Sequence, residues 1–310
     1  MTGTAAKPGS AASQPGGTAA MPGGAAGEAG AAVLGTARLV LAASAAAPPA
    51  PDDVCLAVTG RRVVVAVGVD GGWRFPRVAE CPGATEPVPV GTLDGVPVWA
   101  CVAASTVDNP LQARGWPSVA ANVAEPLAAL AGRALQVVTW RRTHRFCGAC
   151  KAELADVAGE HARRCPACEL FVPMQLSPAV LVLVRRGADE VLLVRHAYGP
   201  KELWALVAGF VESGESLEQA VSREVAEEVG LTVTGATYFG SQPWALSGPG
   251  VLLVGFTAVC ADSAAEPVAD GRELVEAAWF RVDGLPEPLP PAYSMSRWMI
   301  DAAADGRRSG

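Results

Sequence analysis

The sequence lacks long hydrophobic runs, an excess of basic residues and a hydrophobic segment behind its early lysine, Lys7. The apolar stretch from Pro178 to Val184 is only strand-sized, whereas a membrane helix needs about 20 apolar residues. The net charge of −7 gives no basic footprint for general nucleic-acid binding, so a polyanionic substrate would need bound cations or a local basic patch. We therefore expect no membrane span, no secretory signal and a cytoplasmic location.

Cysteine is present, but not in the pattern of a secreted disulfide framework. Of the eight cysteines, four form two C-x-x-C pairs. The other four lie singly among apolar neighbours: Cys55, Cys81, Cys101 and Cys260. This distribution predicts one metal site plus four buried or half-buried thiols in a reducing compartment.

Composition and apolar patterning divide the chain into four parts. Residues 1–35 are rich in Gly, Ala, Pro and Ser and predict a disordered tail, since they cannot bury enough surface to fold. Residues 36–143 predict a small α+β domain without a recognisable chemical constellation. Its elements are expected as strands at Arg62–Val69, Val96–Ala104 and Leu135–Trp140 and as a helix at Val119–Leu130 that ends at Gly132.

The second half has clearer patterning. Residues 144–172 hold the cysteine pairs, and residues 173–310 predict a larger domain with both strands and helices. Its elements are expected as a hairpin of Ala179–Val184 and Val191–Arg195, a helix at Leu217–Val229 that stops at Gly230, a strand at Val251–Val259 and a short helix at Ser294–Ala303.

The four paired cysteines predict a structural zinc site. Cys147 and Cys150 are separated by fourteen residues from Cys165 and Cys168, and each pair can place two thiolates on one tetrahedral Zn²⁺. Four sulfurs leave no open position, so His161 within the loop is expected to be a solvated residue. The alternatives are a redox C-x-x-C, which the duplication disfavours, and a ribbon that reads nucleic acid with the nearby basic residues His144, Arg145, Arg163 and Arg164.

Three glutamates in the predicted helix point to catalytic metal chemistry. Glu224, Glu227 and Glu228 stand at i, i+3 and i+4 and share one helical face, where their charges repel. Hard divalent cations such as Mg²⁺ or Mn²⁺ relieve that repulsion. An ordinary solvated acidic helix is the alternative.

The residues around these acids form part of the same pattern. Gly209 and Gly214 allow a tight loop before the helix. Arg223 is expected to pair with Glu215 or Glu227 and to orient the acids. Bound metals would bridge a diphosphate and lower the pKa of an attacking water, and one glutamate would accept its proton. The spacing leaves open which glutamate this is.

The stretch GFVESGESLEQAVSREVAEEVGL, residues 209–231, satisfies every fixed position of the Nudix signature. A zinc ribbon directly before a Nudix domain, introduced by His144-Arg-Phe-Cys-Gly, and the later Ser241-Gln242-Pro243-Trp244 resemble the bacterial NADH pyrophosphatase branch of the Nudix hydrolases. The resemblance covers roughly residues 120–301. It implies an α+β fold: a Nudix α/β/α sandwich with a mixed sheet, preceded by a zinc ribbon and a small α+β N-terminal domain.

The resemblance also implies roles for single residues. Glu273 would be a metal ligand from outside the signature, with Glu276 as its alternative, and Phe210 would stack on adenine. The dinucleotide pocket would be formed by Ser241, Gln242, Pro243, Trp244 and Ser296. Without the resemblance, Phe210 and Trp244 are equally typical of core packing.

Two departures from the family pattern fall on the recognition of base and ribose. Ala245-Leu246-Ser247 stands where the family has Pro-Phe-Pro, with about two extra residues before the next strand. Phe171-Val172-Pro173 stands where the family has a Tyr-Pro pair, whose tyrosine stacks on the base from the partner subunit. The departures leave the metal ligands intact and place the substrate in question.

The implied reaction is hydrolysis of NADH or NAD⁺ to AMP and nicotinamide mononucleotide, with removal of NAD caps from the 5′ end of RNA as a further activity. A homodimer is implied only by the resemblance. Two alternatives stay open: a Nudix hydrolase of ADP-ribose, a dinucleoside polyphosphate or another nucleoside diphosphate derivative, and a nucleotide-sensing module without turnover. The intact glutamates disfavour the last.

Overall fold

The structure, a computed structural model, describes residues 39–104, 107, 109–245 and 250–306. The predicted disordered tail lies outside the described residues. In the part that is described, no helix is long and apolar enough to cross a membrane. The N-terminal elements are β1 (Leu39–Leu41), β2 (Val54–Thr59), β3 (Arg62–Val67), β4 (Trp73–Arg74), the 3₁₀ helix η1 (Val78–Glu80), β5 (Thr85–Leu93), β6 (Val96–Val102), β7 (Leu111–Gly115), α1 (Trp116–Ala120) and α2 (Glu125–Thr143).

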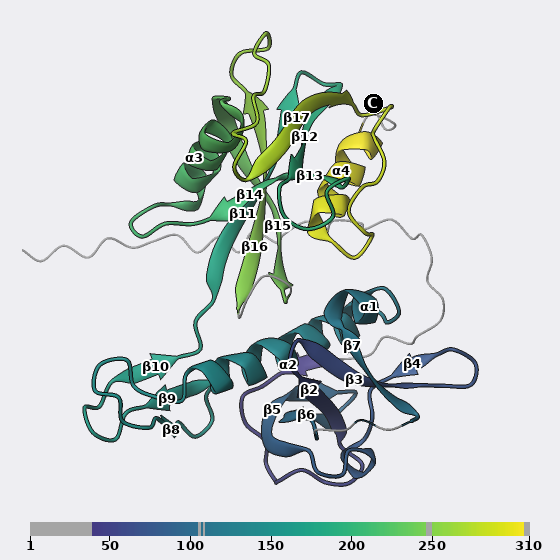
Figure 1. The fold of residues 1–310 in the computed structure, drawn as a ribbon, viewed down its shortest axis with the longest axis vertical. Coiled ribbons are helices and arrows are strands. Elements are labelled where there is room, and N and C mark those ends of the chain that lie inside the picture. Colours follow the sequence, from purple (N-terminus) through teal and green to yellow (C-terminus); the bar gives the residue numbers. More distant parts are fainter. Residues whose placement is uncertain (1–38, 105–106, 108, 246–249, 307–310) are drawn as a thin grey trace, which may run out of the picture. The chain divides into compact units, whose positions relative to one another are not determined.

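The N-terminal domain is built on a seven-stranded sheet in the order β1-β5-β6-β2-β3-β4, with β7 also paired to β3 (Figure 1). β2 and β6 run parallel at its centre. Strand alternation sends Leu56 and Val58 into the core that α2 covers, and it sends Cys55 and Ala57 to the opposite face. The strands predicted at Arg62–Val69 and Val96–Ala104 are confirmed as β3 and β6.

The helical part of this domain differs from the prediction. The predicted helix at Val119–Leu130 is wrong in its bounds, because α1 ends at Ala120 and α2 begins at Glu125. Gly132 lies inside α2, where a Cβ would meet the Trp116 indole nitrogen at 3.0 Å, so it permits close packing instead of ending a helix. The strand predicted at Leu135–Trp140 is also wrong. This segment is helical, and it looks strand-like because α2 is buried on more than one side.

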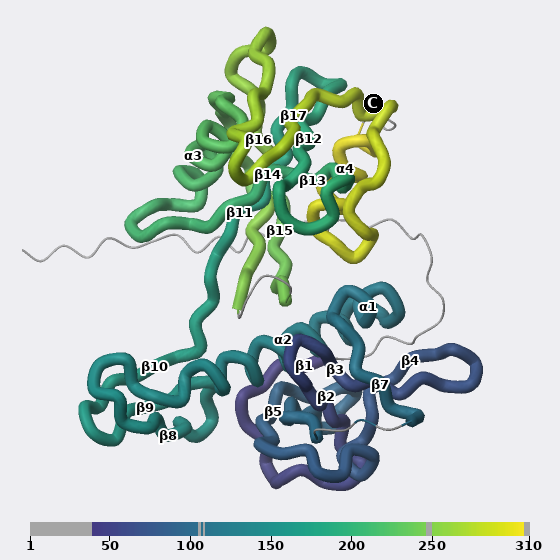
Figure 2. The backbone as a smooth tube through the Cα atoms, in the orientation of Figure 1, coloured from purple at the N-terminus to yellow at the C-terminus, as the bar shows by residue number. Residues whose placement is uncertain are grey.

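The cysteine-bearing segment forms a small three-stranded sheet of β8 (Ala155–Asp156), β9 (Ala162–Arg164) and β10 (Phe171–Pro173). The chain then continues directly from β10 into the C-terminal domain (Figure 2). The elements of that domain are β11 (Ser177–Arg186), β12 (Glu190–His196), β13 (Trp204–Ala205), β14 (Val207–Phe210), α3 (Leu217–Val229), β15 (Val233–Trp244), β16 (Val251–Cys260), β17 (Leu274–Arg281) and α4 (Met295–Asp305).

The C-terminal domain is an α/β/α sandwich around a mixed sheet. The strand order is β13-β12-β11-β16-β15, with β14 paired to β11 and β17 to β12, and β11 and β16 are parallel. Along β11, Val180 and Val182 pack with α3 while Leu181 and Leu183 pack with α4. The two helices therefore cover opposite faces of one sheet (Figure 1).

This arrangement confirms the predicted α+β fold class. The predicted hairpin, catalytic helix, strand and last helix correspond to β11–β12, α3, β16 and α4. The division at residues 36–143, 144–172 and 173–310 stays a prediction.

Candidate functional site

The predicted acidic site begins where β14 leads into the loop before α3. β14 pairs with β11 so that Gly209 stands opposite Val180. An added Cβ at Gly209 would lie 1.9 Å from Cδ of Glu224. The Glu224 carboxyl group therefore occupies the space that a side chain at residue 209 would fill, which explains the glycine.

Local sequence fixes both ends of α3. Ser216 caps the helix by accepting a hydrogen bond from the amide of Gln219 (3.2 Å), and the Gln219 side chain accepts one from the amide of Ser216 (2.8 Å). Gly230 ends the helix in the left-handed conformation, with φ of 69°. The apolar face packs in the core, and the helix also buries Glu224 and Glu228.

Arg223 holds the acids in place. Its guanidinium donates to both carboxylate oxygens of Glu215 (2.7 and 2.9 Å), to Glu224 (2.8 Å) and Glu227 (3.0 Å), and to the carbonyl of Phe210 (2.9 Å). Of the two pairings predicted as alternatives, Arg223 makes both. The Arg223 guanidinium, joined by the amide of Glu212, lowers the pKa of Glu215 to about 2. Glu215 therefore stays ionised and acts here as an orienting group.

Glu228 is the most deeply buried of the three acids. Its exposed fraction is 3 %, and neither carboxylate oxygen has a hydrogen-bond partner of good geometry among the described residues, although the amide of Ala208 approaches it. Burial, followed by the nearby charges of Glu224 and Glu273, raises the pKa of Glu228 to about 8 in the absence of a cation. Burial also raises the pKa of Glu224. Such a carboxyl group is ionised at neutral pH only when a positive charge compensates its burial.

Glu273 lies near these acids because Asp270, which the sequence did not single out, holds the turn before it. Asp270 accepts hydrogen bonds from the amides of Arg272 (3.1 Å), Glu273 (3.1 Å) and Leu274 (2.9 Å), and its own amide donates to the carbonyl of Glu228 (3.0 Å). Asp270 therefore fixes the turn that carries Glu273 beside α3. The signal that could have revealed it is the Asp-Gly turn directly before Arg272.

The alternative ligand, Glu276, is engaged elsewhere. It lies in β17 opposite Arg195 of β12 and accepts a hydrogen bond from that arginine at 2.8 Å. Glu273, by contrast, is close enough to Glu224 and Glu228 to affect the ionisation of both. This placement favours Glu273 as the ligand from outside the signature.

Tyr198 and His196 also border the acidic site, and no motif or spacing in the sequence pointed to them. Their rings lie 5.0 Å apart, and His196 contacts the carbonyl of Leu206 through Nε2 at 3.1 Å. Burial, followed by the charges of Glu228, Glu273 and Glu224, raises the pKa of Tyr198 to about 12. His196 is the last residue of β12 and Tyr198 follows two residues later, and β12 pairs with β17, the strand that Glu273 directly precedes.

The donor set fits a hard divalent cation. Glu224 and Glu273 lie near enough to the buried, unpartnered carboxylate of Glu228 to affect its ionisation, with Glu227 more exposed at the rim. These oxygens are not drawn together closely. Among the residues that the structure describes, only the four cysteines have all candidate ligand atoms within 4.8 Å of one another.

The residues predicted to contact the substrate differ in their exposure and in whether their polar groups are already hydrogen-bonded. Phe210 leaves 53 % of its surface exposed beside the Arg223 network and is free to stack. Ser241 and Pro243 are exposed on β15, whereas Gln242 is buried and both ends of its amide are used, with Tyr293 O at 2.8 Å and Met295 N at 2.9 Å. Because β15 alternates, Ser241 and Pro243 face the opposite side of the strand from Gln242 and Trp244, and the pocket formed by the four residues stays a prediction.

Trp244 and Ser296 are placed by packing. Trp244 makes an edge contact with Trp116 (5.2 Å between centroids), and its carbonyl accepts a hydrogen bond from Gln136 at 3.2 Å. The side chain thus packs against the N-terminal core. Ser296 is buried with a hydroxyl that has no partner among the described residues. Leu246 and Ser247, where the sequence departs from the family pattern, lie outside those residues.

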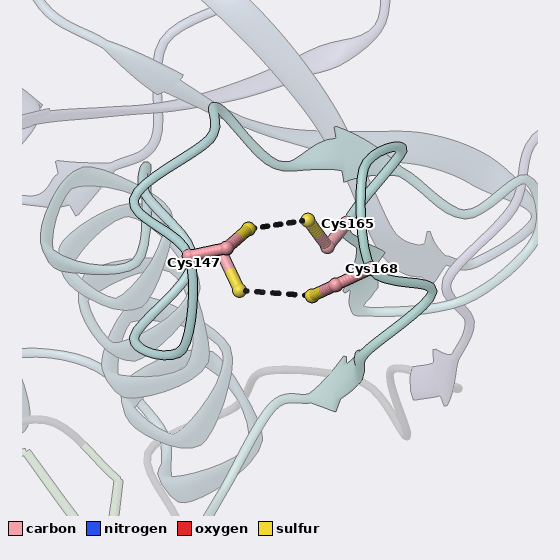
Figure 3. Close-up of side chains that lie close together, drawn as sticks. Cys147, Cys165 and Cys168 are labelled. Carbon is pink, nitrogen blue, oxygen red and sulfur yellow. Dashed lines mark hydrogen bonds between the residues drawn. The ribbon is translucent and has the colours of Figure 1, made fainter.

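The four paired cysteines converge as the spacing predicts (Figure 3). Sγ of Cys147 lies 3.6 Å from Sγ of Cys168, and Sγ of Cys150 lies 3.4 Å from Sγ of Cys165. Tetrahedral zinc–thiolate geometry, with bonds of about 2.3 Å, needs sulfur–sulfur separations of about 3.8 Å. The arrangement therefore fits one structural zinc ion.

The two cysteine turns have the same backbone design. Lys151 and Glu169, each directly after the second cysteine of a pair, adopt positive φ and donate amide hydrogen bonds to the carbonyls of Cys147 (2.8 Å) and Cys165 (3.0 Å). Backbone amides of Cys150 and Ala149 lower the pKa of Cys147, which favours the thiolate that zinc needs. His161 is no part of this group, but it is partly buried, so its expected solvation is wrong.

Comparison with known proteins finds separate family matches for the cysteine-bearing segment and for the C-terminal domain. Residues 142–172 match the family model of the NADH pyrophosphatase zinc ribbon domain, and residues 175–299 match that of the NUDIX domain. The NAD-capped RNA hydrolase NudC of Deinococcus radiodurans is 39% identical over 227 residues, which cover 72% of this chain and 79% of that protein. The protein of the same name from Pseudomonas fluorescens is 39% identical over 215 residues, covering 68% of this chain and 75% of the relative.

Proposed function

The chain belongs to the Nudix hydrolase family, in the group that carries an NADH pyrophosphatase zinc ribbon, and from this premise we propose that it hydrolyses the diphosphate of NADH or NAD⁺ to AMP and nicotinamide mononucleotide. The observation that carries the proposal is the buried, unpaired carboxyl group of Glu228 beside Glu224 and Glu273. The relatives named as NAD-capped RNA hydrolases support the choice of substrate.

The acidic site would hold Mg²⁺ or Mn²⁺ through Glu224, Glu227, Glu228 and Glu273. A cation bound there would neutralise charge on the diphosphate and lower the pKa of the attacking water. Arg223 keeps Glu224 and Glu227 in position, and Glu215 keeps Arg223 in position. One of the glutamates of α3 accepts the proton from the water, and Glu215 is a poor candidate because both of its oxygens are bound by Arg223.

Substrate recognition would combine stacking and polar contacts around this centre. The exposed ring of Phe210 supports stacking on adenine, and exposed Ser241 can contact the dinucleotide. Gln242 and Trp244 would act by holding the pocket wall, and the unpaired hydroxyl of Ser296 supports a polar contact nearby. Phe171 is 40 % exposed, which supports a role of its ring in base stacking across a homodimer.

The same centre would serve for the 5′ end of NAD-capped RNA, in keeping with the names of the relatives and with a cytoplasmic location. A related substrate such as ADP-ribose or a dinucleoside polyphosphate remains the alternative. The specific observation in its favour is that Ala245 begins a segment that departs from the family pattern.

A product assay separates these substrates. Purified protein is incubated with NADH, NAD⁺, ADP-ribose and a diadenosine polyphosphate, each with Mg²⁺, with Mn²⁺ and with a chelator. Metal-dependent release of AMP, fastest from NADH or NAD⁺, is the expected result. A clear preference for another compound would keep the hydrolase and reject the substrate.

A second measurement tests the centre itself. Glu228→Gln removes the buried charge at nearly constant shape, so turnover should be abolished while NADH binding measured by calorimetry persists. The sensing alternative is supported if the parent protein binds NADH but shows no turnover with any metal.

A further inference from the structure

Three of the cysteines outside the ribbon gather on one face of the N-terminal sheet. Cys55 lies in β2 and Cys101 in the parallel strand β6, where Cys55 stands opposite Trp99 and Ala57 stands opposite Cys101. The thiols therefore project from neighbouring strands to the same side. They belong to one apolar cluster, against which Cys81 packs as well.

Cys81 reaches this cluster from a segment bound to β2. The amide of Cys55 donates to the carbonyl of Pro76 (2.9 Å), and the amide of Val78 donates to the carbonyl of Asp53 (2.9 Å). Cys81 follows directly after η1 and lies in a loop, in contrast to the two strand cysteines, so its side chain has more freedom to approach a partner.

Access distinguishes the three thiols. Cys55 and Cys101 are 1 % and 4 % exposed, whereas Cys81 is half-buried. Cys81 lines a cavity of about 510 Å³ together with Glu80, Pro82, Ala84, Ala103 and Leu111. A small reagent that enters from solvent meets Cys81, the one thiol of the three that lines this cavity, and Cys55 belongs to the apolar cluster against which Cys81 packs.

The two neighbours of Cys55 are shifted in the same direction, because a hydrogen bond with Cys55 lowers the pKa of Cys101 as it does that of Cys81. A hydrogen bond from Cys55 lowers the pKa of Cys81, against the opposing effects of burial and of Glu80. Hydrogen bonding with Cys101 and Cys81, together with burial, raises the pKa of Cys55. The thiolate is the nucleophile in disulfide exchange, and access to the cavity makes Cys81 the attacking group, with Cys55 as the proton-bearing neighbour.

We propose that Cys81 and Cys55 form a reversible redox pair that is oxidised by low-molecular-weight disulfides. The Cys81 thiolate attacks one sulfur of the small disulfide, whose S–S bond breaks, and one small thiolate leaves with a proton from solvent. Cys55 then gives up its proton and attacks Sγ of Cys81, which releases the second small thiol. Two protein thiols are oxidised to one disulfide, and one small disulfide is reduced to two thiols.

The geometry favours a redox pair over a second metal centre. The ligand atoms of these three cysteines do not all lie within 4.8 Å of one another, whereas those of the ribbon quartet do, in the part of the chain that the structure describes. Cys55 interacts with each of the other two, and of these two only Cys81 lies in a loop and lines the cavity, whereas Cys101 lies in strand β6. The pair is independent of the proposed hydrolase activity.

The test uses the full zinc-loaded protein in glutathione buffers of increasing oxidised fraction. Free thiols are alkylated, and the chain is cleaved before aspartate, which places Cys55, Cys81 and Cys101 in the separate peptides 53–69, 70–93 and 94–107. Mass spectrometry should find peptides 53–69 and 70–93 joined with the loss of two hydrogen atoms, and dithiothreitol should separate them. Zinc content should stay unchanged.

Two variants sharpen the result. Cys55→Ala should accumulate a glutathione adduct on Cys81 that the parent protein resolves, and Cys101→Ala should still form the joined peptides. A link between peptides 53–69 and 94–107, oxidation confined to the ribbon cysteines, or a stable adduct on Cys81 in the parent protein would each overturn the proposal. Zinc content and thermal unfolding establish that the variants are folded.

Discussion

The most direct test of the acidic centre is Gly209→Ala, because the structure places the Glu224 carboxyl group where the new methyl would stand. The alanine Cβ would lie 1.9 Å from Cδ and 2.0 and 2.2 Å from the carboxylate oxygens of Glu224. Non-bonded carbons approach to about 3.5–4.0 Å, so the carboxyl group must withdraw by roughly 1.5–2 Å. The strand backbone at this position accepts alanine, so the perturbation falls on the side chain of Glu224.

The expected effect on catalysis is large compared with that on stability. A displacement of about 1 Å of a catalytic group can reduce the rate by about 100-fold, so kcat/KM for NADH should fall by about 100-fold or more. Overpacking of this kind costs about 1–3 kcal/mol in the free energy of unfolding, which thermal or urea unfolding would detect. The activity assay should also show a higher requirement for the metal.

The matched control is Gly284→Ala. No heavy atom lies within 4 Å of a Cβ built at Gly284, and its φ is not in the left-handed region. Its activity and stability should stay close to those of the parent protein. Parent-like activity and metal dependence in Gly209→Ala would refute the placement of Glu224 in the catalytic centre.

Three further predictions follow from neighbouring contacts. Arg223→Lys keeps the charge but cannot reproduce the bidentate pairing with Glu215 and the bonds to Glu224 and Glu227, so kcat should fall by at least about 10-fold while the helix content by circular dichroism stays the same. Asp270→Ala removes the acceptor that fixes Glu273, and metal activation should weaken by about 10- to 100-fold in a titration with Mn²⁺; an unchanged titration would remove Glu273 from the ligand set. Cys168→Ser should release zinc, measured by atomic absorption, and lower the thermal stability, and retention of stoichiometric zinc would contradict the four-cysteine site.

The catalytic helix could be predicted from sequence because its determinants are local. The acids, the apolar face and the stop at Gly230 all follow from spacing within one helix, and α3 has the predicted bounds. The zinc site was predictable for the same reason, since two tight turns with fixed spacing define it.

The features that could not be predicted depend on contacts between distant segments. α2 looks strand-like over Leu135–Trp140 because it is buried on more than one side, so its sequence lacks a polar stripe. Asp270 and Tyr198 acquire their positions only when β12 pairs with β17 and the turn before β17 meets the end of α3. The cluster of Cys55 and Cys101 likewise requires the parallel pairing of β2 with β6.

The alternation along the end of β15 limits how substrate preference can change in this scaffold. Gln242 is bound through its amide to Tyr293 and to Met295 at the start of α4, and Trp244 packs against the N-terminal core, so substitutions there are expected to disturb packing before they alter selectivity. Ser241 and Pro243 are exposed on β15, so a substitution there should disturb packing less. Directed evolution of substrate specificity should therefore vary Ser241 and Pro243 and keep Gln242 and Trp244. Natural relatives with other substrates should likewise differ at the first two positions more than at the other two.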